Sequence, residues 1–137
     1  MKKSYLSAGL LVVITIALLG AGCSSKKSTS SLAPFQPQIT NMPDDFQFQA
    51  TGVQNVSGTF PYVWQNTGTS ANVNQACAIT SGTATLTIFD NDTTQVYSQS
   101  LAVNGTIPTS VGTTGSWIIR VVLTNCYGTL NFRVQKP

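Results

Sequence analysis

The chain has 137 residues, of which 42% are hydrophobic and 8% are charged, and its formal net charge is +3. Two cations, Lys2 and Lys3, precede an apolar N-terminal run, so the remainder carries a net charge of only +1. A chain this neutral, with no basic stripe, lacks the surface that nucleic-acid binding requires. It has no histidine, which the usual hydrolytic triads need. We therefore expect no catalytic residues, no cofactor and no nucleic-acid partner.

The N-terminal segment has the parts of a secretory signal. Lys2 and Lys3 are followed by an apolar stretch over 8–19 and then by Leu19-Gly20-Ala21-Gly22-Cys23. This arrangement resembles a bacterial lipoprotein signal. The resemblance implies that residues 1–22 are removed and that Cys23 carries lipid on its sulfur. It also implies a cell-envelope protein anchored to a membrane, and Ser24 favours the outer membrane if the source is a diderm bacterium.

Two other interpretations of the N-terminus remain open. The stretch from Tyr5 to Gly22 contains 18 uncharged residues, close to the roughly 20 that span a bilayer. An uncleaved anchor ending at Lys26-Lys27 is therefore one alternative, and an ordinary secreted protein is the other.

Residues 23–45 predict a flexible linker behind the lipidated cysteine. Serines, lysines and three prolines occur here without a period of 2 or 3.6. As a coil, the 22 residues from Ser24 to Asp45 would span about 25 Å root-mean-square. The alternative is that Phe35, Ile39 and Met42 dock as a first edge strand.

Residues 46–137 predict one all-β domain, a small β-sandwich or jelly-roll-like fold. Apolar and polar residues alternate over 46–50 and 83–89, and a further β-type run covers 95–101. These runs are separated by Gly, Asn and Asp, and none has the spacing of a helix. Asn104-Gly105 is a strong hairpin signal.

The end of the chain predicts a hairpin at the centre of the core. Its strands would be 117–123 and 130–134 around a four-residue loop, so that Leu123 opposes Leu130. All seven alternating apolar side chains would then be buried, Trp117 included. The same register places Arg120 opposite Arg133 on the outward face, either as an anion-binding spot or as two solvated side chains.

Cys77 and Cys126 are the two cysteines left after Cys23. In a small domain outside the cytoplasm, such a pair predicts a disulfide. Closing a loop of about 50 residues would stabilise the domain by roughly 4 kcal/mol.

Two further groups are candidate ligand sites. Tyr62 and Trp64, with Tyr97 and Tyr127, could form a sugar-stacking platform or belong to the core. Asp90 and Asp92 flank Asn91 in a turn, and they are weak candidates for calcium, since the glutamate of an EF-hand loop is missing; Asx-turn chemistry is the simpler explanation. We therefore expect an envelope lipoprotein whose non-catalytic domain binds a protein or gives structural support, the alternative being a carbohydrate-binding module.

Overall fold

The computed structural model describes residues 27–137, and the predicted signal peptide and Cys23 lie outside this range. Seven strands and one short 3-10 helix occur in it: η1 Ala33–Phe35, β1 Gln38–Met42, β2 Asp45–Asn66, β3 Asn72–Gln75, β4 Ala78–Phe89, β5 Gln95–Ser100, β6 Gly105–Pro108 and β7 Gly115–Gln135. The predicted all-β class is confirmed.

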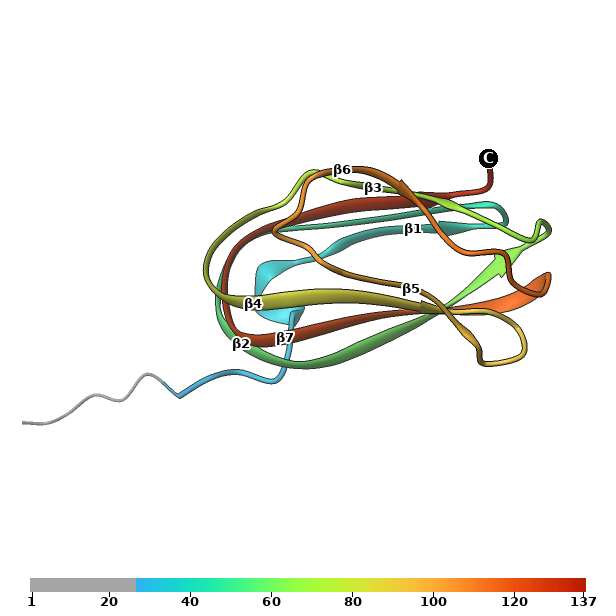
Figure 1. Ribbon diagram of the computed structural model, residues 1–137. Helices are drawn as coiled ribbons and strands as arrows, with labels where there is room; N and C mark the ends of the chain where they lie inside the picture. The colour runs from blue at the N-terminus through green and yellow to red at the C-terminus, as the bar shows by residue number, and fades with distance from the viewer. Residues whose placement is uncertain (1–26) are drawn as a thin grey trace, which may run out of the picture.

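The seven strands form a single antiparallel sheet that folds over into two packed layers (Figure 1). The first layer has the order β1, β2, β7, β3, β6, and uses the first half of β2 and the second half of β7. The second layer has the order β2, β7, β4, β5, and uses the other halves of the two long strands. The predicted sandwich is thus made by two strands that belong to both layers.

The long strands bend at one end of the molecule, which we call the corner end (residues 51–57, 78–83 and 124–129). The pairing of β2 with β7 shifts register three times between Ala50 and Gly58. β4 shifts twice against β7 between Ile79 and Thr83. Such bulges bend strands and increase their twist. Positive φ angles accompany them at Gly52, Asn55, Gly82, Asn125 and Gly128.

The predicted terminal hairpin is wrong, because its loop is a bend within β7. Residues 115–135 form one strand whose first half pairs with β2 and β4 and whose second half pairs with β2 and β3. Leu123 opposes Gly58 and Ala84, and Leu130 opposes Ala50. The apolar alternation was nevertheless a correct guide to the core, since all seven predicted side chains are buried.

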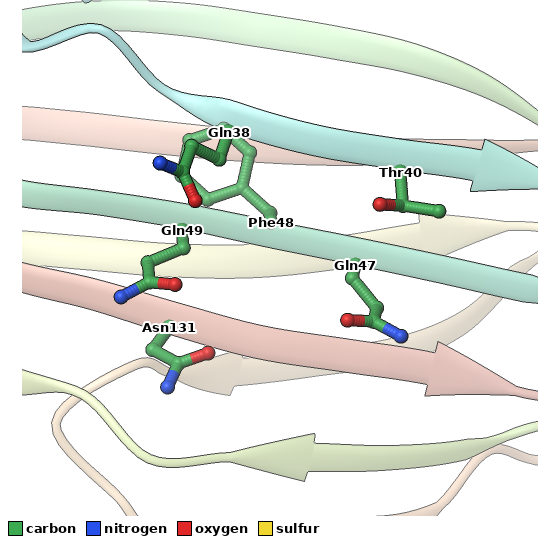
Figure 2. A pocket seen from close by; sticks show the side chains of 6 residues that line it. All are labelled: Gln38, Thr40, Gln47, Phe48, Gln49 and Asn131. Carbon is green, nitrogen blue, oxygen red and sulfur yellow. The ribbon is translucent and has the colours of Figure 1, made fainter.

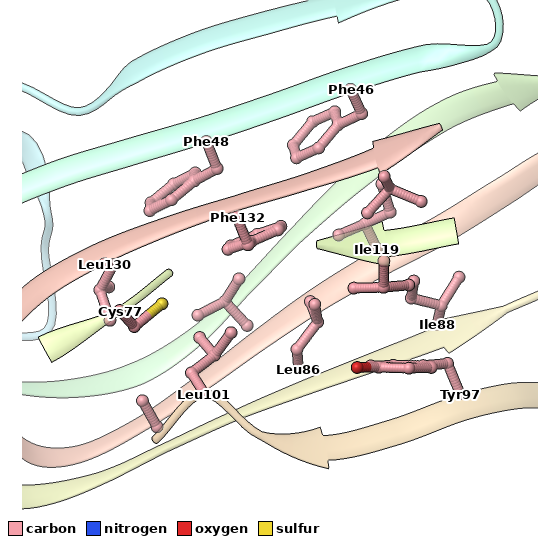
Figure 3. Packing of buried hydrophobic residues seen from close by; sticks show 14 of the residues in the cluster. Phe46, Phe48, Cys77, Leu86, Ile88, Tyr97, Leu101, Ile119, Leu130 and Phe132 are labelled. Carbon is pink, nitrogen blue, oxygen red and sulfur yellow. The ribbon is translucent and has the colours of Figure 1, made fainter. Parts of the chain in front are cut away.

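The core lies between the layers and is rich in aromatic rings (Figure 3). Phe132 stacks on Phe46 and Phe48 with centroids 6.1 and 5.2 Å apart. The two tryptophans, Trp64 and Trp117, meet edge to face at 5.9 Å. Burial of such large rings dominates the energetics of a small domain.

The domain begins earlier than predicted. Part of the predicted linker is structured: β1 pairs with β2, and Leu32 is 4% exposed. The open alternative of a first edge strand is correct for Ile39 and Met42, which lie in β1 with exposed side chains, whereas Phe35 belongs to η1.

The hairpin predicted at Asn104-Gly105 is also wrong. β5 pairs with β4, whereas β6 pairs with β3, so the chain between them crosses from one layer to the other. The Asn104 side chain accepts from the backbone N–H of Cys77 at 2.8 Å and donates to its carbonyl at 3.0 Å. This asparagine therefore satisfies a neighbouring backbone and does not form a hairpin turn.

Candidate functional site

The outer face of the first layer is covered by amide and hydroxyl side chains; we call it the amide face. It consists of outward positions on three adjacent strands: Gln38, Thr40, Gln47, Gln49, Asn131 and Arg133. Figure 2 shows most of them around a depression of about 100 Å³. A second depression, of about 60 Å³, lies beside Gln36 and Thr51. Both are well below the roughly 300 Å³ at which small-molecule pockets begin.

A two-pronged ion pair lies on the amide face. The Arg133 Nε and Nη2 donate to the two carboxylate oxygens of Asp45 at 2.9 and 2.8 Å. The hydrogen bond from Arg133 lowers the pKa of Asp45, and the same bond raises the pKa of Arg133. Because both groups are partly exposed, the pair is screened by solvent and adds little to stability.

The outer face of the second layer carries an apolar patch among threonines and Arg120; we call it the apolar face. Val63, Ile118 and Phe89 form one row across β2, β7 and β4. Pro61 lies in the next row, with Arg120 and Thr87, and Val122 lies in the row beyond, between Thr59 and Thr85. Val63 is 66% exposed, among the largest exposures of any large hydrophobic residue in the described range. Arg120 lies over the Phe89 ring, with its guanidinium carbon 4.6 Å from the ring centroid.

Arg120 and Arg133 do not oppose each other, so the predicted register is wrong and the two side chains form no shared anion-binding spot. Arg120 opposes Pro61 and Thr87 on the second layer, whereas Arg133 opposes Gln47 and Asn74 on the first. Their predicted opposition depended on the terminal hairpin. Each is instead held by a different partner, a ring in one case and a carboxylate in the other.

Of the two uses left open for Tyr62 and Trp64, the structure supports core packing and contradicts the sugar-stacking platform. Trp64 is fully buried, and its indole N–H donates to the Met42 carbonyl at 3.0 Å. Tyr62 packs inward against Phe46 and Phe48. Tyr97 is 5% exposed. The shared strand parity of Tyr62 and Trp64 was real, but that side of the strand faces the core.

Asp90 and Asp92 organise turns at the end opposite the corner end. The Asp90 carboxylate accepts from the backbone N–H groups of Asp92, Thr94 and Thr113 at 2.8–3.0 Å. These bonds, that from Thr113 most of all, lower the pKa of Asp90. Within residues 27–137 no three His, Cys, Asp or Glu side chains are grouped to hold a metal ion. The structure thus gives Asp90 the turn role that was the simpler explanation.

Cys77 and Cys126 are both buried and unpaired, which corrects the predicted disulfide. The Cys77 thiol contacts the backbone of Asn131, donating to its carbonyl and accepting from its N–H at 3.2 Å each. The thiol thus takes the place of a backbone partner for β7 just after β3 ends. Burial raises the pKa of both thiols, and the Cys77 thiol adds to the effect at Cys126.

A buried polar network was missed by the sequence reasoning. Gln75 is 2% exposed. Its amide nitrogen donates to the carbonyls of Ser100 and Val103, and its oxygen accepts from the Tyr97 hydroxyl at 2.9 Å. Burial raises the pKa of Tyr97 to about 12. The sequence did contain a hint of this burial: Gln75 lies two residues after Val73, and alternate residues of a strand point to the same side, here the inward side of β3.

No buried side-chain nitrogen or oxygen in the described range lacks a hydrogen-bond partner. In residues 27–137 no helix is long and apolar enough to cross a membrane. The lipidation predicted at Cys23 lies outside these residues.

Comparison with known proteins identifies no family. No family model and no curated protein matches the chain. Among solved structures, the chain is similar to part of a glycosylation-associated protein (Gap123) complex from Streptococcus agalactiae. The identity is 10% and the TM-score 0.39, and the match covers 81% of this chain and 41% of that one. A similarity this weak carries no argument about function.

Proposed function

We propose that this chain is a lipid-anchored protein of the cell envelope whose β-sandwich binds another protein through its apolar face, without performing chemistry. The anchor would be lipid on Cys23, placing the protein on the outer membrane if the source is a diderm bacterium. The support for the anchor is the Leu19–Cys23 motif together with the basic and apolar segments before it.

The observation that carries the binding proposal is the composition of β7 in the second layer. Residues 117–123 read Trp-Ile-Ile-Arg-Val-Val-Leu, and the buried residues alternate with half-buried Ile118, Arg120 and Val122. A strand that is apolar on both sides is typical of a sheet covered on both faces. The described residues cover only the inner face, so the outer one is available to a partner.

The surroundings of the apolar face also suit a protein partner. Aromatic residues and arginine are enriched at protein interfaces, and Phe89 and Arg120 stack here. The amide face offers no comparable apolar area, because its outward positions are almost all amides and hydroxyls.

Site-specific photocrosslinking in the native envelope tests this function. A photoreactive residue at Val63 should capture one defined partner, whereas one at Gln49 on the amide face should not. The captured protein, once purified, should bind the wild-type chain and bind Val63→Asp at least about tenfold more weakly, as truncating a central contact does. Gln49→Asp is the matched control. Equal binding by both variants would remove the apolar face from the proposal.

The anchor has its own test. Cys23→Ala should move the protein from the membrane fraction to the soluble fraction, and mass spectrometry of the wild-type protein should find acylated Cys23 as the first residue. An intact residue 1–22 segment would favour the uncleaved anchor.

The alternative function, a carbohydrate-binding module, would have to use the amide face, because Trp64 is buried. Gln38, Gln47, Gln49 and Asn131 offer donors and acceptors for hydroxyl groups, but there is no exposed ring for stacking among them. Glycan binding that is lost in Gln47→Ala and kept in Val63→Asp would favour this alternative.

A further inference from the structure

The N-terminal segment joins the domain at the corner end. The Thr29 N–H donates to the Asn55 carbonyl at 3.1 Å, and the Thr29 carbonyl accepts from the Ser57 N–H at 3.0 Å. These bonds form a parallel bridge to Val56 at the bend of β2. Leu32, three residues further on, is buried. In Figure 1 the blue segment leaves beside the bends, whereas the C-terminus lies at the opposite end.

The connection from Cys23 to this point is short. Five residues lie between Cys23 and Thr29, so six Cα–Cα steps join them. Six such steps span no more than about 20 Å, at roughly 3.3–3.6 Å each. The opposite end lies a strand length further away, since the nine residues of β2 from Gly58 to Asn66 rise about 30 Å at 3.3 Å each. A lipid on Cys23 would therefore hold the corner end near the bilayer.

Charge is distributed along the same axis. All four acids, Asp44, Asp45, Asp90 and Asp92, belong to the turns and strand ends opposite the corner end. The segments of the corner end (51–57, 78–83 and 124–129) contain no aspartate, glutamate, lysine or arginine. Lys26 and Lys27 come just before Thr29. Each lysine near an anionic membrane surface contributes about 1 kcal/mol of attraction. At the opposite end Asp45 and Asp44 are paired with Arg133 and Lys136, so repulsion from the membrane would come mainly from Asp90 and Asp92.

We propose that the corner end is the membrane-facing surface of this protein and that its partner is an anionic phospholipid surface. The domain then stands with its strands along the membrane normal, and both outer faces remain accessible. The loops that carry the four acids are furthest from the lipid. This inference rests on the proposed lipid anchor at Cys23.

Energy transfer from the protein to the membrane surface tests the orientation. The full-length lipidated protein would be labelled at Thr80→Cys on the corner end or at Thr69→Cys on the opposite end, both exposed positions. Its two native thiols are buried, and unmutated protein shows how far they react. In vesicles of phosphatidylethanolamine and phosphatidylglycerol with acceptor headgroups, transfer from Thr80→Cys should be at least twice that from Thr69→Cys. Equal transfer would overturn the proposal. Gln54→Cys replaces Thr80→Cys if that variant does not fold.

Two controls separate the causes. A 20-residue Gly/Ser spacer between Lys27 and Ser28 should lower transfer from both sites and shrink their difference; an unchanged difference would contradict the role of the short connection. Vesicles of phosphatidylcholine alone should also shrink the difference, and an unchanged one would contradict the role of anionic lipid. Failure of the anchor itself is seen beforehand, because unlipidated protein would not float with the vesicles.

Discussion

The two outer faces of the sandwich are built on the same two strands, yet they differ in chemistry. On the first layer, the outward positions of β2 and β7 include Gln47, Gln49 and Asn131. On the second layer, the outward positions of the same strands include Val63 and Ile118. Each face also has one arginine of β7. Arg133 is paired with a carboxylate, and Arg120 with a ring. Strand identity therefore does not determine the character of a face.

The difference teaches where to look for binding in a small sandwich. A solvated antiparallel layer normally alternates apolar and polar residues, as the first layer does. The second layer departs from that rule at outward Val63, Ile118 and Phe89, which lie beside outward threonines. Apolar patches on a protein surface often mark interaction sites, which is why we assign the partner to this face.

Gly128→Ala should give the largest effect, because it attacks the bend that lets β7 serve both layers. A Cβ at Gly128 would collide with the carbonyl oxygen of Ala78, at a φ of +134°. Gly105→Ala is the matched control, since its φ is +130° and no atom lies within 4 Å of the added Cβ. We expect Gly128→Ala to cost at least about 2 kcal/mol more than Gly105→Ala. Urea unfolding measures both, and equal costs would show that the bend tolerates a side chain.

Native-state protection of the two thiols should be the next largest effect. Cys77 and Cys126 are buried beside the bend, so they react only when the structure opens. We expect labelling at least about tenfold slower than in 6 M guanidinium chloride, with two thiols per chain reacting in the denaturant without reductant. A denatured protein that shows no free thiol would restore the disulfide.

The stability lost on replacing Arg133 should depend on pH, whereas that lost on replacing Arg120 should not. The lowered pKa of Asp45 means that its contribution is complete above the ordinary aspartate value of about 3.9 and is lost as the pH falls through the folded-state pKa. Arg133→Gln should therefore reduce the free energy of unfolding at pH 7 and make no difference in strong acid.

Arg120→Gln is the comparison for that prediction. It removes the contact with Phe89, which is worth about 0.5–1 kcal/mol at an exposed site. Its cost should be the same at pH 7 and pH 3. Urea unfolding between pH 3 and pH 7 measures the free energy of unfolding of both variants. If the two variants lose the same amount of stability at every pH, the hydrogen bond from Arg133 does not lower the pKa of Asp45.

The smallest effect is expected from Val63→Asp and Gln49→Asp, one on each outer face. Both positions are exposed, and substitutions at such sites usually change stability by less than about 0.5 kcal/mol. Thermal unfolding should therefore not separate them, whereas partner binding should. A large loss of stability in Val63→Asp would indicate a structural role for this side chain.

The sequence by itself determined the class of the fold and the part of the core that β7 contributes. The alternation at Trp117–Leu123 and Leu130–Val134 identified buried residues correctly, because a strand has only two sides and one of them must leave water. The Leu19–Cys23 motif, on which the proposed lipid anchor rests, is likewise a local pattern.

Only the tertiary structure decided which strands pair and which face each outward residue occupies. The stretch Asn125–Gly128 fits a hairpin loop and a strand bend equally well, since a glycine with positive φ serves either. The choice depends on whether Leu123 and Leu130 gain more by pairing with each other or with β2 and β4. That comparison involves residues 40 to 80 positions away, which local patterns do not contain. The positions of Arg120, Arg133, Trp64 and the two thiols all follow from it.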